Sequence, residues 1–139
     1  MEEVQKAAFS FESFKVSQFS YNENNDNEKN LKIGLEPKGI YNSKTGEFTL
    51  SLEFISHNED NTDNPIFQLK SVAVFKFKSN IDYSDIPKFF YMNSIAIMFP
   101  YLRAFISTLT LQANTKLLKL GLMNLSGLEE PLKNNVTVI

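Results

Sequence analysis

A long helical run with a proline inside it, Asn93–Asn114, is the feature that most limits how this chain can fold. Proline lacks the backbone donor that a helix interior needs, but it is favoured at a helix start. We therefore expect Asn93–Phe99 to form a short entry turn and the main helix to begin at Pro100. Its apolar residues are too widely distributed for a single stripe: Tyr101, Leu102, Ala104, Phe105, Ile106, Leu109, Leu111 and Ala113. A helix of this kind must be covered on more than one side, and in a chain with one sheet the second cover is expected from another subunit.

Four segments that precede this run have the residue alternation of β-strands. Their expected ranges are Phe9–Tyr21, Leu31–Pro37, Phe48–Phe54 and Phe67–Lys78. The alternation of the first segment is imperfect, and a bulge near Glu12–Ser13 would reconcile it. Because polar loops connect the segments in order, we expect a four-stranded antiparallel sheet with one solvated face. The long helix would cover the other face, which gives an α+β fold.

Two further apolar segments flank the long helix. The connection Asn80–Met92 is unusually aromatic, with Ser84 as a candidate N-cap and Pro87 in the first turn of a short helix. A second apolar segment begins at Leu117 and is expected to become helical near Ser126. The sequence thus predicts a single domain over residues 1–139, with a core at about 10–132 and a mobile tail from Lys133 onward.

Composition limits the possible partners. The chain has 14 basic and 16 acidic residues and a net charge of −2, which argues against nucleic acid and gives no attraction to an anionic membrane. The charged start of the chain is unlike a signal peptide, and the run Ile95–Leu102 is too short to span a bilayer. With no cysteine, the chain has no disulfide or thiolate site. We therefore expect a soluble cytoplasmic protein without membrane insertion.

No catalytic constellation is recognisable. The one histidine, His57, is expected in a polar loop, exposed to solvent. The segment Asn58–Asn64 has oxygen ligands suited to calcium but lacks the glycine and final glutamate of an EF-hand, so a solvated hairpin tip is favoured. There is no glycine-rich phosphate loop, nucleophile elbow or zinc spacing. We expect neither enzymatic activity nor a cofactor or metal.

The helix start carries a family resemblance. The stretch Asn93–Ser107, which contains Phe-Pro-Tyr-Leu-Arg-Ala-Phe-Ile-Ser, resembles the Phe-Pro-Tyr/Phe-Ala-Arg-x-x-Ile-Ser segment of the SecB protein-export chaperones. The stretch Leu120–Leu125 is similar to that family's Leu-x-Leu-x-Pro-Val-Asn-Phe segment, and the order of strands, aromatic crossover and helix also matches. The sequence departs from the pattern at Leu102 and Ala104. The resemblance covers about residues 10–132 and indicates a divergent SecB-like protein.

The resemblance implies an ATP-independent holdase, a chaperone that binds unfolded or nascent polypeptide in hydrophobic grooves. It also implies a homotetramer assembled as a dimer of dimers, with the long helices between the sheets of different dimers. The implied groove residues are Phe89, Phe90, Tyr91, Met92, Leu122, Met123, Leu125 and Leu128. The implied interface residues are Tyr101, Phe105, Thr108, Leu109 and Gln112.

Several alternatives stay open at this point. Each groove candidate could instead pack the core. The protein could serve export, a general holdase role or one dedicated client such as an antitoxin. In standard members acidic residues on the exposed sheet face dock the motor SecA, whereas the fourth strand here offers Gln68, Lys70, Lys76 and Lys78. We therefore expect weak or absent SecA binding. The competing functional hypothesis is a small oligomeric α+β interaction module without chaperone activity.

Overall fold

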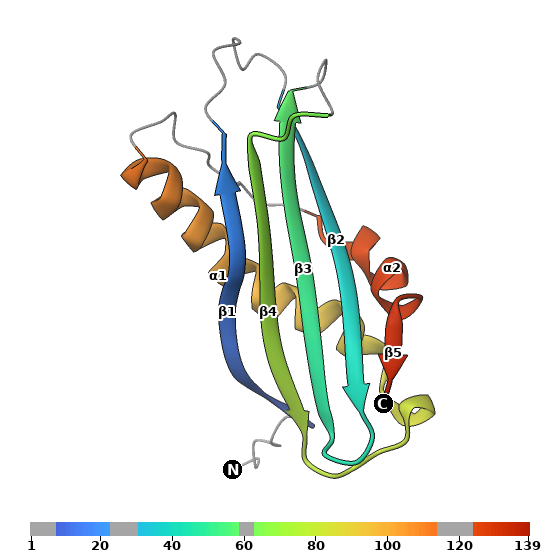
Figure 1. Ribbon diagram of the computed structural model, residues 1–139. Helices are drawn as coiled ribbons and strands as arrows, with labels where there is room; N and C mark the ends of the chain where they lie inside the picture. Colours follow the sequence, from blue (N-terminus) through green and yellow to red (C-terminus); the bar gives the residue numbers. More distant parts are fainter. Residues whose placement is uncertain (1–7, 23–30, 59–62, 114–123) are drawn as a thin grey trace, which may run out of the picture.

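A computed structural model describes residues 8–22, 31–58, 63–113 and 124–139. The strands are β1 (Phe9–Tyr21), β2 (Leu31–Asn42), β3 (Glu47–Asn58), β4 (Phe67–Phe77) and β5 (Val136–Val138). The helices are the 3₁₀ turn η1 (Tyr83–Asp85), α1 (Lys88–Gln112), the 3₁₀ turn η2 (Ser126–Leu128) and α2 (Glu129–Lys133). The long helix α1 crosses one face of the sheet diagonally, and α2 and β5 lie beside β2 (Figure 1).

The sheet has five strands in the order β1-β4-β3-β2-β5. The first four pair antiparallel, and β5 pairs parallel with β2. The predicted α+β fold, a sheet covered by one long helix with a shorter C-terminal helix, is therefore confirmed. The fifth strand differs from the expectation, because the residues predicted to form a mobile tail include β5.

The core lies between the sheet and α1. Alternate residues of β3 and β4 point toward the helix and are buried, as their period of two requires: Phe48, Leu50, Leu52, Phe54, Phe67, Leu69, Ala73, Phe75 and Phe77. From α1 the matching buried residues include Phe90, Ile95, Met98, Leu102 and Ile106. The two-layer arrangement buries one apolar face of each element and leaves the opposite face of the sheet in solvent.

Two irregularities in β1 keep its apolar residues on the helix side. The register against β4 shifts between Phe11 and Ser13, as the sequence predicted, and again between Val16 and Gln18. As a result, all six apolar residues of β1 lie opposite inward-facing residues of β4: Phe9, Phe11, Phe14, Val16, Phe19 and Tyr21.

The second strand extends past its predicted end at Pro37 to Asn42. Gly39 donates its amide to the carbonyl of Asn135 at 3.0 Å, so Gly39 and residues two positions away direct their backbone groups away from β3. Pro37 therefore stands where its missing N–H costs β2 no bond to β3. The turn to β3 closes at Gly46, whose φ of 76° explains the choice of glycine.

The long helix begins at Lys88, so the prediction that it starts at Pro100 is wrong. Proline at position 100 leaves the carbonyl of Ala96 without its helical donor. Both Ala96 and Pro100 are exposed, so water can satisfy that carbonyl and the helix continues. The expected cap at Ser84 is also replaced, because η1 forms there without a side-chain cap and Pro87 directly precedes α1.

The continuous α1 spans 25 residues, which is long and apolar enough to cross a membrane by length and composition alone. The apolar run Ile95–Leu102 therefore underestimated the length of the apolar helix. One face of α1 packs against the sheet, however, which is the arrangement of a core helix, and core helices meet the same criterion.

Candidate functional site

The four predicted groove residues at the start of α1 do not share one environment. The side chain of Phe89 is 53% exposed and Met92 is also exposed, whereas Phe90 is 0% exposed and Tyr91 is buried. Because they lie on a helix instead of an extended crossover, consecutive side chains point about 100° apart. The expectation that all four line a groove is corrected for Phe90 and Tyr91, which pack the core.

The ring of Phe90 is the centre of an aromatic cluster. It meets Phe48 edge-on with ring centroids 4.8 Å apart, and Phe9 at 4.9 Å with an interplanar angle of 90°. It also packs against Phe75 and Phe77. These contacts join α1 to β1, β3 and β4, so Phe90 stabilises the fold instead of offering surface to a ligand.

The second predicted groove segment lies partly within the described residues. Leu125 and Leu128, at η2, are half-buried and pack against the core. The turn η2 contacts α1, so these leucines lie near the same helix as Phe89 and Met92. Leu122 and Met123 lie outside the described residues.

The solvent side of α1 is almost uncharged. Along its 25 residues the helix carries two charged side chains, Lys88 at its start and Arg103, whose guanidinium lies 5.9 Å from the ring centre of Phe99. The exposed side instead presents large apolar residues: Phe89, Met92, Ile97, Tyr101 and Leu111. Of the predicted interface residues, Tyr101, Thr108 and Gln112 are exposed, and Phe105 and Leu109 are half-buried. A surface helix normally carries a polar outer face, so this side is suited to contact another apolar surface.

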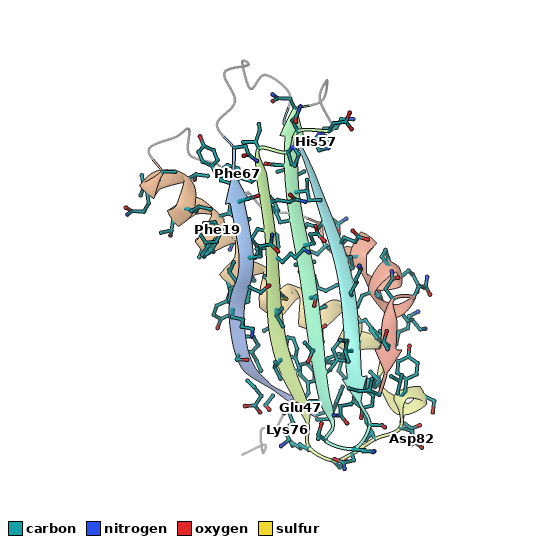
Figure 2. All side chains as sticks on the ribbon, in the orientation of Figure 1. Phe19, Glu47, His57, Phe67, Lys76 and Asp82 are labelled. Atoms are coloured by element: carbon teal, nitrogen blue, oxygen red, sulfur yellow. The ribbon has the colours of Figure 1, made fainter. Side chains whose placement is uncertain are left out.

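An aromatic seam joins this side of α1 to the outermost strand, and sequence reasoning missed it. We use the name for five rings: Phe11, Phe14, Phe19, Tyr101 and Phe105. Tyr101 stacks on Phe11 at 5.1 Å and contacts Phe14, and Phe19 meets Phe105 at 5.6 Å. Phe19 and Tyr101 are about half exposed (Phe19 is labelled in Figure 2). The signal in the sequence was the excess of 13 phenylalanines, but only the bulges of β1 place three of them beside the helix.

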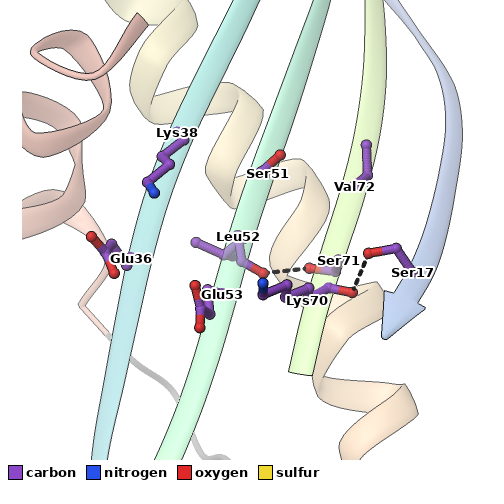
Figure 3. Close-up of a pocket in the computed structure, with 9 residues that line it drawn as sticks. All are labelled: Ser17, Glu36, Lys38, Ser51, Leu52, Glu53, Lys70, Ser71 and Val72. Carbon is purple, nitrogen blue, oxygen red and sulfur yellow. Dashed lines mark hydrogen bonds between the residues drawn. The ribbon is translucent and has the colours of Figure 1, made fainter. Parts of the chain in front are cut away.

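The opposite face of the sheet carries a shallow hollow of about 220 Å³ (Figure 3). Its lining includes two acidic residues, Glu36 and Glu53, and two basic residues, Lys38 and Lys70. Glu53 lies opposite Lys70 in the register, and Glu47 lies opposite Lys76 (Figure 2). Two of the lysines predicted on the fourth strand, Lys70 and Lys76, therefore lie opposite glutamates of β3, whereas Lys78 lies beyond the end of β4. This part of the sheet face is of mixed charge and not basic.

Within the described residues, no group of three or more acidic or histidine side chains could hold a metal ion. His57 belongs to β3 and is half-buried, so its assignment to an exposed loop is wrong; its Nδ1 lies 2.9 Å from the carbonyl oxygen of Asn58. Most of the segment weighed for calcium, residues 59–62, lies outside the described residues. Burial raises the pKa of Tyr91, with Tyr83 contributing, and burial also raises the pKa of Tyr41, which donates to the carbonyl of Ile81. Both phenols thus stay neutral.

Comparison with known proteins identifies the family. Residues 4–130 match the family described as preprotein translocase subunit SecB, and the chain therefore belongs to the SecB family. The uncharacterized protein MJ0357 of Methanocaldococcus jannaschii is 29% identical over 136 residues, which cover 92% of this chain and 86% of that protein.

Two solved structures resemble the fold at low sequence identity. The SecB-like chaperone Rv1957 of Mycobacterium tuberculosis, in complex with a ChAD peptide from the HigA1 antitoxin Rv1956, aligns with a TM-score of 0.68 and 12% identity. The alignment covers 84% of this chain and 88% of that one. A Streptococcus agalactiae protein of unknown function aligns with a TM-score of 0.51 and 11% identity, over 82% of this chain and 97% of that one.

Proposed function

We propose that this protein is an ATP-independent holdase of the SecB family that binds extended, non-native polypeptide in the cytoplasm. The observation that carries the proposal is the nearly uncharged, apolar exposed side of α1 in a chain of this family. Apolar surface captures unfolded segments by area burial, at about 25 cal/mol per Å², with little demand on sequence. Holding a chain in this way is a binding function that requires neither a cofactor nor a reaction.

Two pairs of described residues are the proposed client contacts. Phe89 and Met92 supply exposed apolar area at the start of α1, and Leu125 and Leu128 contribute from η2. The methionine adapts its shape to different side chains, which suits a binder of many sequences. Leu122 and Met123 remain proposed contacts from the sequence alone.

The far half of α1 is proposed as the subunit interface. Tyr101, Phe105, Thr108, Leu109 and Gln112 lie along its exposed and half-buried side, next to the aromatic seam. A second copy of the chain that covers this half would leave the start of the helix for clients. We propose a dimer of dimers, because the solvent-exposed side of α1 is apolar along its length and offers area for more than one subunit contact.

The client class is supported by the Mycobacterium tuberculosis neighbour, a SecB-like chaperone in complex with an antitoxin peptide. An extended peptide is therefore the ligand proposed for this chain too, either as one dedicated client or as part of many clients. Docking to SecA is proposed to be weak, since glutamates of β3 lie opposite lysines of β4 on the exposed sheet face and leave it without a uniform acidic charge.

The test is aggregation of a chemically denatured model enzyme, followed by light scattering without ATP. A holdase suppresses the scattering at near-stoichiometric amounts, and Phe89→Ala lowers the suppression. Lys38→Ala, on the opposite face of the sheet, serves as the matched control. If the folded oligomer leaves scattering unchanged, the protein is instead an interaction module without chaperone activity.

A further inference from the structure

The strand β5 is short, parallel and mostly exposed, and it occupies the outer edge of β2 (Figure 1). Its residues Val136–Val138 pair with Gly39, Ile40 and Tyr41. Every other strand pair in the described sheet is antiparallel and at least 10 register positions long. Parallel pairing is slightly weaker per residue, so β5 is the least firmly held strand of the sheet.

Backbone contacts dominate what holds β5 in place. The amide of Gly39 donates to the carbonyl of Asn135 at 3.0 Å, and the amide of Ile139 donates to the carbonyl of Tyr41 at 2.9 Å. Ser43 donates twice to the carbonyl of Ile139, from its amide at 3.0 Å and from its Oγ at 3.1 Å. Any extended chain can make these bonds, because they involve no side chain of β5.

The side chains of β5 add one specific contact. Val136 is half-buried and packs against the core beside Gly39, where a methyl group on the glycine would lie 3.3 Å from the valine Cγ2. The remaining side chains face solvent, with Val138 46% and Ile139 61% exposed. One β-branched side chain over a glycine, with its neighbours free, is a weak anchor for a strand.

The edge also limits how an added strand can pair. Gly39, Tyr41 and Ser43 direct their backbone groups outward, and Pro37, the next position in this series, has no N–H to offer. The ladder of donors on this edge therefore ends at Gly39, which limits full pairing of an occupant to Gly39 and the residues after it. The helix α2 also contacts β2, in addition to β5.

From these observations we propose that the Gly39–Ser43 edge of β2 is a strand-acceptor site for an extended β-branched segment of a client, with β5 as its resident occupant. A client segment that runs parallel to β2 takes the place of β5 when β5 detaches. The segment needs a free N–H at alternate positions and a Val- or Ile-like side chain over Gly39, as in Val136-Thr137-Val138. The inference rests on the proposed function only for the identity of the incoming chain.

The first experiment tests strand exchange without any client. A variant that ends at Lys133 is mixed with a fluorescent peptide, Asn-Asn-Val-Thr-Val-Ile, which has the sequence of residues 134–139, and anisotropy is recorded. We expect the shortened protein to bind the peptide at least about tenfold more tightly than the full chain, in which β5 competes at high effective concentration.

The control peptide carries Thr137→Pro. The backbone of Thr137 faces β2, since Asn135 and Ile139 on either side of it both bond to β2. Proline removes that N–H, so the control peptide should not bind. Equal binding of both peptides, or no binding to a shortened protein whose circular dichroism matches the full chain, would overturn the proposal.

A second variant covers the case in which the shortened protein does not fold. Ile40 and Thr137 are register partners with exposed side chains, and the chain has no native cysteine. Neighbouring strands are close enough for a disulfide, so Ile40→Cys with Thr137→Cys can lock β5 in place. The oxidised protein should lose peptide binding and regain it on reduction. Equal binding in both states, or a disulfide that forms only between copies, contradicts the proposal.

The client is tested by competition. A permanently unfolded chain, reduced and carboxymethylated α-lactalbumin, should displace the fluorescent peptide from the shortened protein or from the reduced cysteine variant. Failure to displace it overturns the client assignment of the edge. The aggregation assay above stays independent, because holdase activity that persists equally in the oxidised variant supports the proposed function while it rejects the edge as the client site.

Discussion

Alanine substitution of two adjacent phenylalanines, Phe89 and Phe90, tests which of them belongs to the core and which to the proposed client surface. Phe89 and Phe90 have identical side chains and adjacent positions at the start of α1, yet one is 53% exposed and the other 0%. Each serves as the control for the other, since Phe89→Ala and Phe90→Ala make the same chemical change at nearly the same place.

Phe90→Ala should destabilise the fold by about 3–5 kcal/mol, because it leaves a cavity between the rings of Phe9, Phe48 and Phe75. A small protein has a total stability of about 5–15 kcal/mol, so the loss is a large part of it. In a urea titration the unfolding midpoint should fall by about 1–3 M at an unchanged slope. Measurement at several protein concentrations separates this change from oligomer dissociation.

Phe89→Ala should leave the midpoint almost unchanged, within about 0.5 kcal/mol, as expected for a surface substitution. Its ring exposes roughly 100 Å², worth at most about 2.5 kcal/mol of client binding. Since area converts to affinity incompletely, we expect client affinity to fall roughly tenfold. A Phe90→Ala protein that keeps its stability and loses client capture would refute this division of roles.

Three further outcomes follow from the geometry. Folding raises the pKa of Tyr41 and Tyr91, so the unfolded chain ionises first, and stability should fall above about pH 10 by up to about 1.4 kcal/mol per pH unit for each tyrosine. Tyr91→Phe should reduce this fall in urea titrations at alkaline pH, and an unchanged dependence of stability on pH contradicts the prediction. Gly46→Ala should cost about 1 kcal/mol or more in thermal unfolding because of its positive φ, whereas Gly34→Ala, with open space at its Cβ, should cost less. Tyr101→Asp should shift the oligomer to smaller species in analytical ultracentrifugation, and an unchanged mass would remove Tyr101 from the proposed interface.

The strands could be predicted from the sequence because their signal is local. In β3 and β4 the alternation of apolar residues sets which face is buried, and the structure follows it residue by residue. The bulge near Glu12–Ser13 was predictable for the same reason, since the apolar pattern of β1 changes phase there. A strand's side chains alternate between two faces, so a change of phase is visible in the sequence.

The helix start and the fifth strand could not be predicted, because both depend on tertiary context. Whether Pro100 begins a helix or lies inside one depends on whether the freed carbonyl of Ala96 reaches water. Whether Val136–Val138 is a tail or a strand depends on the free edge of β2, which is distant in the sequence. The start of α1 at Lys88 in turn decided which of Phe89 and Phe90 is exposed.

The same dependence explains why a core and a binding surface can share one helix. A strand separates its two faces by alternation, but α1 separates them by a rotation of about 100° per residue, so neighbours such as Phe89 and Phe90 reach opposite environments. The outer side is free to be apolar only because the inner side is already anchored by the aromatic cluster around Phe90. The stability that holds α1 on the sheet therefore comes from residues outside the proposed client surface. If the proposed holdase function holds, the exposed apolar residues of α1, and with them the clients, could change at little cost to the fold.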